Sequence, residues 1–194
     1  MTRERAREKF IDYQKLKIEF IHERKEYMAP AASWHNRNGY NIQAIFINYI
    51  ESKQLPHIVF ADSLRVYYNS GNNYVMPDIA IVADPSEVQN DRIHTAPDLV
   101  IEILSPSTRE TDMAEKSDVY GLFGVPEYWT VNVKEKTVTV WKNVGNQLKI
   151  TKVYEFPPKD YDPDIDDHIY QTKFHTLLFG DNLTIDLNDV FRGL

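Results

Sequence analysis

Residues 98–104 form the most apolar strand that the sequence predicts, and Glu102 lies inside its aliphatic run. The short length and the β-branched residues of this run favour a buried strand over a helix. A buried carboxylate loses its hydration, which costs several kcal/mol unless a cation or hydrogen-bond donors compensate for the loss. The fold must therefore place such a partner beside Glu102.

Predicted helices and strands alternate along the rest of the chain. Helices are expected at 3–16, from Trp34 to Ser52 and at 111–123. Ser33 and Thr111 have the chemistry of N-caps, and Gly124 lies just past the end of the last helix. Strands are expected at 57–61, 64–68, 73–83, 98–104, 127–133, 137–142 and 147–155, with one or two more within 18–30. This order predicts an α/β fold.

The composition is that of a folded protein, with 42% hydrophobic and 26% charged residues in a chain of 194. We expect one domain over residues 1–194. The sequence contains no cysteine, which excludes disulfides and thiolate chemistry. The first ten residues are too charged for a signal peptide, and no window approaches the ~18 apolar residues of a membrane span. A cytoplasmic location is therefore expected.

The net charge of -7 is unevenly distributed. Residues 1–60 carry 10 Lys and Arg against 7 Asp and Glu, whereas the remaining residues carry 12 against 22. This balance argues against a tight non-specific nucleic-acid binder, which depends on phosphate attraction. It leaves room for an enzyme with a local basic surface, and carboxylates that hold a divalent cation also make a site look acidic.

A second carboxylate, Asp78, follows Pro77 in another apolar segment. If the two strands are neighbours, Asp78 and Glu102 can emerge on one face of a sheet. Two carboxylates, a backbone carbonyl and waters suit Mg²⁺ or Mn²⁺. The alternative is that Glu102 forms an ion pair with a buried Lys or Arg, while Asp78 is a turn residue.

The helix predicted after the Glu102 strand carries Asp112, Lys116 and Tyr120 at spacings of four residues, so they share one face. A strand–loop–helix unit returns this helix over the sheet, where Lys116 can reach the carboxylates. There its ammonium could orient a water or stabilise charge on a phosphate. The alternative is an ordinary surface pair between Asp112 and Lys116.

The segments "PDIAIV", "EILSPST" and "GVPEYWTV", together with Asp112, Lys116 and Tyr120, resemble the Uma-two family of restriction-endonuclease-like proteins. The resemblance implies a PD-(D/E)XK nuclease fold, in which helices flank a central mixed sheet. It implies a metal site formed by Asp78, Glu102 and the carbonyl of Ile103, with Asp78, Glu102 and Lys116 as the catalytic residues.

Two departures from the family pattern stand out. Leu104 occupies the position where the nuclease signature has its lysine, and Lys116 on the next helix is the expected replacement. The chain reads "HER" at residues 22–24, where the family usually has Asp-Gly-Glu. Glu19 and His35 are candidates for accessory contacts, although the preferred interpretation is a solvent-facing acid for Glu19 and a solvent-facing or capping-region histidine for His35.

These observations predict a Mg²⁺-dependent (or Mn²⁺-dependent) endonuclease that hydrolyses phosphodiester bonds of DNA and acts as a homodimer if it cuts both strands. Asp78, Glu102 and Lys116 would carry the reaction, with Asp112 and Tyr120 in accessory roles. The alternative is a catalytically inactive module of the same fold that binds nucleic acid or a protein. A purely structural protein with ion-paired acids is the third candidate.

Overall fold

The computed structural model describes residues 17–28, 33–68, 72–104, 109–165 and 168–194. The helix expected at 3–16 lies outside these ranges. The helices are α1 (Ser33–Lys53), α2 (Arg109–Phe123) and α3 (Leu187–Val190), with a 3-10 turn at Pro85–Glu87. The strands are β1 (Lys17–Ile21), β2 (Arg24–Met28), β3 (Ile58–Ala61), β4 (Arg65–Tyr67), β5 (Tyr74–Val75), β6 (Ile79–Val82), β7 (Arg92–Ile93), β8 (Leu99–Leu104), β9 (Glu127–Asn132), β10 (Thr137–Asn143), β11 (Leu148–Glu155), β12 (Lys173–Thr176) and β13 (Gly180–Asp186).

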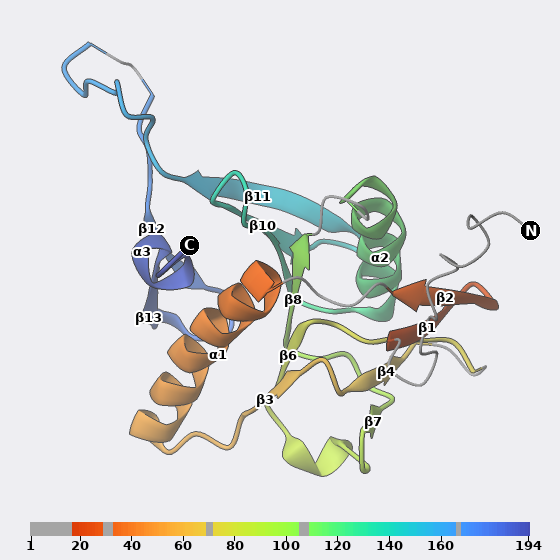
Figure 1. Ribbon diagram of the computed structural model, residues 1–194. Helices are drawn as coiled ribbons and strands as arrows, with labels where there is room; N and C mark the ends of the chain where they lie inside the picture. The colour runs from red at the N-terminus through yellow and green to blue at the C-terminus, as the bar shows by residue number, and fades with distance from the viewer. Residues whose placement is uncertain (1–16, 29–32, 69–71, 105–108, 166–167) are drawn as a thin grey trace, which may run out of the picture.

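The central sheet has six strands in the order β11-β10-β9-β8-β6-β3. β8 pairs in parallel with β9, and the other pairs are antiparallel. α1 and α2 lie on opposite sides of this sheet (Figure 1). The prediction of a mixed sheet flanked by helices is therefore confirmed, and β9, β10 and β11 form the expected meander.

The alternating side chains of β6 and β8 form two separate cores. Ile79, Ile81, Leu99, Ile101 and Ile103 pack with the apolar stripe of α1. The intervening positions pack with α2, as Val100 does with Val119 and Tyr120. A strand buried on both faces reads as a continuous apolar run, which is why β8 was recognisable in the sequence.

A smaller sheet, in the order β2-β1-β5-β4-β7, lies beside α2 (Figure 1). The strand predicted at 73–83 is in fact two strands, because β5 joins this sheet and β6 joins the central one. Pro77 lies between them and cannot donate a ladder hydrogen bond, which ends the pairing. The split allows one short stretch of chain to link the two sheets.

Other element boundaries follow local chemistry. α2 begins at Arg109, so Thr111 lies inside the helix and the predicted N-cap is wrong. Gly124 follows α2 with φ +93°, as expected for a C-terminal glycine. The end of the chain forms a hairpin, β12–β13, and α3, which pack against the α1 face of the sheet. The single-domain organisation stays a prediction.

Candidate active site at the end of β6 and β8

Glu102 is only 6% exposed and lies on the α2 side of β8. Its Oε1 accepts a hydrogen bond of 2.8 Å from the hydroxyl of Tyr120 and one of 3.2 Å from Nζ of Lys116. Both donors come from α2 and are one helical turn apart. The cost of burying Glu102 is therefore offset by an ammonium and a phenol, as the predicted ion pair with a buried lysine requires.

Lys116 is itself buried, with 2% of its side chain exposed, so the alternative that it lies at the surface is wrong. Its Nζ also lies 3.1 Å from Oε1 of Glu19, which in turn accepts a hydrogen bond from the backbone N–H of Met76. The side chain of Asp112 lies outside the described residues.

Glu19 is fully buried on β1, so the expectation of a solvent-facing acid is wrong. The error has a physical reason: β1 has β2 on one side and β5 on the other, and α2 covers the sheet. Among the described residues, Oε2 of Glu19 has no hydrogen-bond partner. Glu19, Glu102 and Lys116 together carry two carboxylates and one ammonium, and hence a formal charge of −1.

Tyr120 lies beside these carboxylates as a neutral phenol. Burial raises its pKa well above the usual value of 10, and the negative charges of Glu102 and Glu19 act in the same direction. Because the proton stays on the oxygen, the hydroxyl is a donor toward Glu102 over the whole physiological range of pH.

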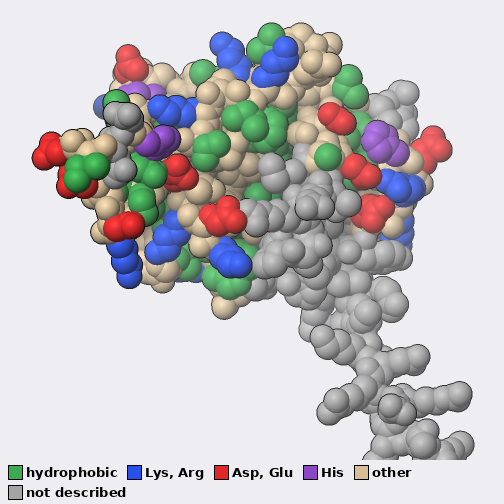
Figure 2. Space-filling view, turned by 90° about the horizontal axis from the view of Figure 1, so that it is seen from above, with side chains coloured by type: hydrophobic (Ala, Val, Ile, Leu, Met, Phe, Trp, Pro, Cys, Tyr) green, Lys and Arg blue, Asp and Glu red, His purple; other side chains and the backbone are tan. Residues whose placement is uncertain are grey.

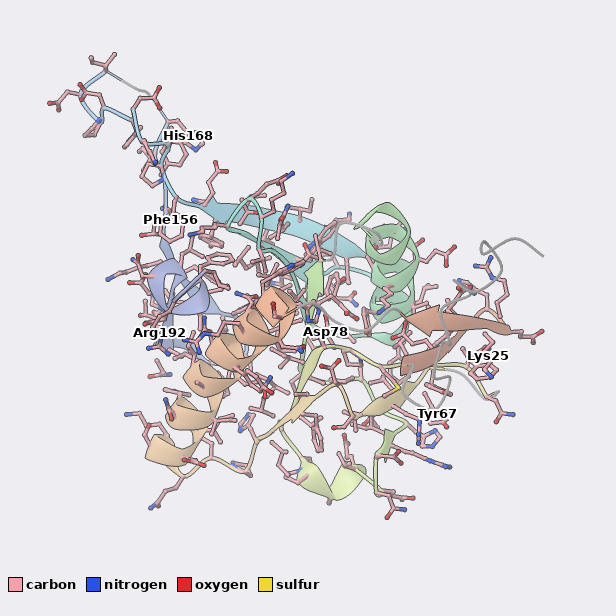
Figure 3. The ribbon with its side chains drawn as sticks, viewed as in Figure 1. Lys25, Tyr67, Asp78, Phe156, His168 and Arg192 are labelled. Atoms are coloured by element: carbon pink, nitrogen blue, oxygen red, sulfur yellow. The ribbon has the colours of Figure 1, made fainter. Side chains whose placement is uncertain are left out.

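Asp78 lies between Pro77 and the first residue of β6. Its Oδ2 accepts a 2.8 Å hydrogen bond from the backbone N–H of Ile103 and lies 3.1 Å from Nε2 of His35 on α1. His35 is 8% exposed in the first turn of α1, so the solvent-facing alternative for this residue is wrong. Figure 3 shows Asp78 between the start of α1 and the central strands.

The pairing of β6 with β8 brings the two predicted metal ligands close together in the sheet. Ile79 pairs with Ile101, so Asp78 and Glu102 are each one residue beyond that pair. Their described contacts nevertheless differ, since Glu102 contacts α2 whereas Asp78 contacts α1. Asp78 precedes the strand, and the alternation of the pleat does not fix the direction of its side chain.

A cavity of about 240 Å³ opens next to Asp78. It is lined by His35, Asn36, Gly39, Tyr40, Gln43, Ala61, Asp62, Asp78 and Ile103. Of the α1 residues that line this cavity, reasoning from the sequence singled out His35 and missed Asn36, Gly39, Tyr40 and Gln43. The only signal in the sequence is the spacing of Asn36, Tyr40 and Gln43, which places three polar residues on one side of an amphipathic helix.

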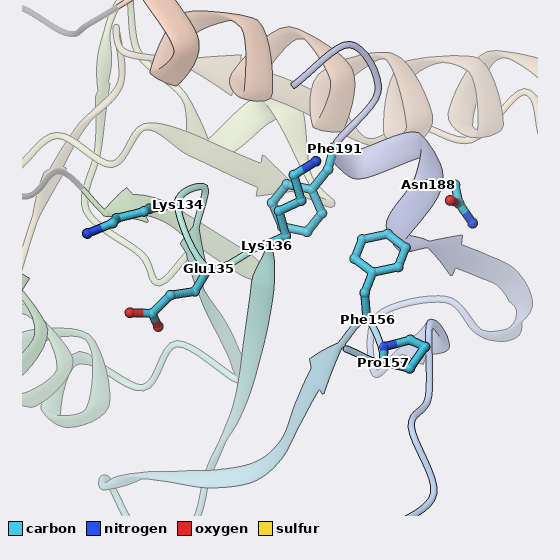
Figure 4. A pocket seen from close by; sticks show the side chains of 7 residues that line it. All are labelled: Lys134, Glu135, Lys136, Phe156, Pro157, Asn188 and Phe191. Atoms are coloured by element: carbon cyan, nitrogen blue, oxygen red, sulfur yellow. The ribbon is translucent and has the colours of Figure 1, made fainter. Parts of the chain in front are cut away.

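A larger cavity, of about 490 Å³, lies away from these residues, between the β9–β10 turn and α3 (Figure 4). It is lined by Lys134, Glu135, Lys136, Phe156, Pro157, Asn188 and Phe191. None of the predicted site residues lines it.

The donor set suits a hard divalent cation. Asp78, Glu102 and the carbonyl of Ile103 offer oxygen ligands. The buried Oε2 of Glu19 and the formal negative charge of the group Glu19, Glu102 and Lys116 also favour a bound cation. The described residues contain no group of three His, Asp or Glu side chains arranged to hold a metal. The predicted ligand set does not need three such side chains, because its third ligand is a backbone carbonyl. Leu104, half-buried at the end of β8, offers no donor.

A mixed sheet flanked by helices, with acids at the adjoining ends of β6 and β8 and a lysine from the next helix, defines a restriction-endonuclease-like protein. Comparison with a solved structure supports this class. The fold matches a crystal structure described as a "putative nuclease belonging to DUF820" from Anabaena variabilis, with a TM-score of 0.68 and 19% identity over 90% of this chain and 89% of that one.

Residues 5–161 match the model of the Uma2 family, described as "Putative restriction endonuclease", and the chain belongs to this family. An uncharacterized protein of Synechocystis, slr1290, is 25% identical over 107 residues. The matched part spans 55% of this chain and 55% of that relative. Among the described residues, no helix is long and apolar enough to cross a membrane.

Proposed function

We propose that the protein is a Mg²⁺-dependent endonuclease that hydrolyses phosphodiester bonds of DNA. The observation that carries the proposal is the arrangement of Asp78 and Glu102 at neighbouring strand ends, with Lys116 bonded to Glu102. Membership of the Uma2 family supports a nuclease function. A divalent ion held by Asp78, Glu102 and the Ile103 carbonyl would activate water and stabilise charge on the phosphate.

The side chains around the proposed ligands fix their orientation. Tyr120 and Lys116 both donate to Oε1 of Glu102, which fixes the orientation of this carboxylate. The N–H of Ile103 and the ring of His35 hold Oδ2 of Asp78 in the same way. Lys116 would also supply positive charge close to the phosphate, the role that Leu104 cannot fill.

The test is the cleavage of supercoiled plasmid DNA with and without Mg²⁺ or Mn²⁺. We expect metal-dependent nicking by the wild type, and a loss of cleavage in Asp78→Asn and Glu102→Gln with unchanged far-UV circular dichroism. Cleavage at the wild-type rate by either variant would contradict the proposed catalytic roles of Asp78 and Glu102. Single-stranded DNA and RNA of the same sequence, tested in parallel, define the substrate. Homodimer formation stays a prediction, which light scattering tests.

The second candidate is an inactive binding module of the same fold. It is favoured by Leu104 in the usual lysine position and by the burial of Lys116 between two carboxylates. This candidate predicts that nucleic acid or a protein binds while Mg²⁺ and Mn²⁺ produce no cleavage. Titration calorimetry with Mg²⁺ alone separates it from a structural protein, which would bind no metal.

A further inference from the structure

The cavity beside Asp78 has two unlike walls. Two successive turns of α1 supply Asn36, Tyr40 and Gln43, at spacings of four and three residues, so that all three lie on one side of the helix. The opposite wall consists of the sheet end with Asp62 and Asp78. The volume of about 240 Å³ is below the ~300–1,000 Å³ of sites for drug-sized ligands and suits one small ring system.

The α1 wall carries groups that recognise flat, polar rings. Tyr40 is 67% exposed although it belongs to a well-packed helix, so its ring is available as a stacking surface. The amides of Asn36 and Gln43 each offer donors and an acceptor, which is the combination that proteins use against the edges of bases.

Gly39 leaves space in this wall. A Cβ at this position would lie 3.5 Å from Cδ1 of Ile103 and 3.6 Å from Nε2 of Gln43, in ordinary van der Waals contact. An alanine therefore fits without a clash, and it would favour the helix by roughly 0.5–1 kcal/mol. The glycine is not required by the packing, and its effect is to keep the cavity open beside Gln43.

Apart from the divalent ion proposed at Asp78, the cavity has no strong positive charge that would hold a phosphate. Its described lining includes the carboxylates of Asp62 and Asp78 and contains no Lys or Arg. On the face seen in Figure 2, acidic, basic and apolar side chains are interspersed, and no large area of positive charge stands out. A neutral ligand with hydrogen-bonding edges suits this lining better than an anion does.

We propose that the cavity binds one unpaired nucleobase of the DNA strand, next to the phosphate that is cut. The base would stack on Tyr40 and be read at its edge by Gln43, Asn36 and Asp62. This inference rests on the proposed function and names its substrate class: strands whose bases are unpaired at the cleavage position. In an intact duplex the base is stacked and paired, so entering the cavity would require flipping it out at a cost of a few kcal/mol.

The test compares the binding of two fluorescent oligonucleotides by the protein of residues 1–194, using anisotropy with Ca²⁺ in place of Mg²⁺. One is a single strand with bases, and the other has the same backbone with abasic sites. We expect the base-bearing strand to bind more tightly and Tyr40→Ala to weaken it about 5- to 150-fold, the range for the loss of one stacked base. Binding of the abasic strand should not change in this variant.

Two further variants keep the test specific. Tyr40→Phe retains the ring and should bind like the wild type, and so should Ile47→Ala, which alters an exposed residue of α1 outside the cavity. Equal binding of the two oligonucleotides, or wild-type binding by Tyr40→Ala, would overturn the inference. Because binding is measured without cleavage, a missing nuclease activity, which would defeat the proposed function, is distinguished from a failure of base binding.

Discussion

The ammonium of Lys116 lies 3.2 Å from Oε1 of Glu102, and the two side chains are 2% and 8% exposed. Lys116 thus links α2 to the central strand β8, and through Glu19 it also links α2 to the smaller sheet. The same ion pairs that hold the two sheets and the helix together orient one of the proposed metal ligands. Stability and activity are therefore coupled at this position.

Replacement of Lys116 by Met should strongly destabilise the fold. Glu19 and Glu102 would remain buried without their shared ammonium, and removal of one partner of a buried ion pair typically costs about 3–5 kcal/mol. Urea unfolding measures the loss. Lys149→Met, at an exposed position on β11, is the matched control and should change stability by less than about 0.5 kcal/mol.

A double variant separates the ion pair from other effects of the Lys116 substitution. Glu19→Gln combined with Lys116→Met removes one of the two repelling charges, so it should be more stable than Lys116→Met alone. If the second substitution adds its own full cost instead, Glu19 and Lys116 do not interact as the 3.1 Å contact indicates.

The hydroxyl of Tyr120 should contribute to both stability and cleavage. Tyr120→Phe removes the 2.8 Å donor to Glu102 and is expected to cost about 1.5–3 kcal/mol, the range for a hydrogen bond to a charged group. Cleavage should fall as Glu102 loses its orientation. Since burial holds the pKa of Tyr120 well above 10, the effect should be the same at pH 6 and pH 9.

Tyr128→Phe is the control for Tyr120→Phe, because it deletes a hydroxyl from a buried ring that lies 5.3 Å from that of Tyr120. Rates of cleavage for both variants, measured across a range of Mg²⁺ concentrations, test the prediction. An equal loss of cleavage rate in the two variants would show that the hydrogen bond from Tyr120 to Glu102 is not important for cleavage.

Most of the fold was predictable because its signals are local. β8 is buried on both faces, and the four-residue spacing of Lys116 and Tyr120 places them on one face of the following helix. The position of Pro77 explains why the strand predicted at 73–83 is divided. The buried strand and the helix that returns over it could be inferred from neighbours in the sequence and the geometry of a strand–loop–helix unit, whereas the division at Pro77 was not predicted.

The remaining parts of the site depend on contacts between distant segments. Glu19 lies on a short strand whose sequence does not distinguish a buried acid from an exposed one, and its burial follows from the packing of α2 against the smaller sheet. His35 is near the start of a helix, where exposure is the usual expectation. Only the docking of α1 against the end of β6 places His35 beside Asp78.

Glu127 should make the stability of the protein depend on pH. It is fully buried, and burial raises its pKa above the ordinary value of 4.5, although hydrogen bonds from Trp129, Leu178 and Leu177 oppose the shift. The folded state therefore binds the proton of the Glu127 carboxyl more tightly than the unfolded state does. The contribution of this proton to the free energy of unfolding is complete below about pH 4.5 and is lost as the pH rises through the pKa of Glu127 in the folded state.

Urea unfolding at a series of pH values tests this dependence by comparing the wild type with Glu127→Gln. The wild type should lose stability relative to the variant as the pH rises from about 4.5. Glu51→Gln, at an exposed position on α1, should show no such difference. A constant gap between the wild type and Glu127→Gln across the series would contradict the raised pKa.

The two helical glycines, Gly39 and Gly121, should respond to alanine in opposite ways. At Gly39 the new methyl group makes only ordinary contacts, so Gly39→Ala should stabilise the fold by about 0.5–1 kcal/mol while it narrows the cavity. At Gly121 a Cβ would lie 3.0 Å from the backbone nitrogen of Leu148 and 3.3 Å from the carbonyl oxygen of Asn146. Backbone atoms cannot move aside as a flexible side chain can, so Gly121→Ala should cost about 1–3 kcal/mol.

The functional effects of these two alanines should not follow their effects on stability. Gly39→Ala should bind the base-bearing oligonucleotide more weakly despite its greater stability, because the methyl group occupies space next to Gln43. Gly121→Ala should lose cleavage together with stability, since α2 carries Lys116 and Tyr120. Thermal unfolding measures the stability of each variant, and anisotropy on the same samples measures its affinity for the oligonucleotide. If Gly39→Ala gains stability and keeps wild-type affinity, the space at this glycine is not used by the ligand.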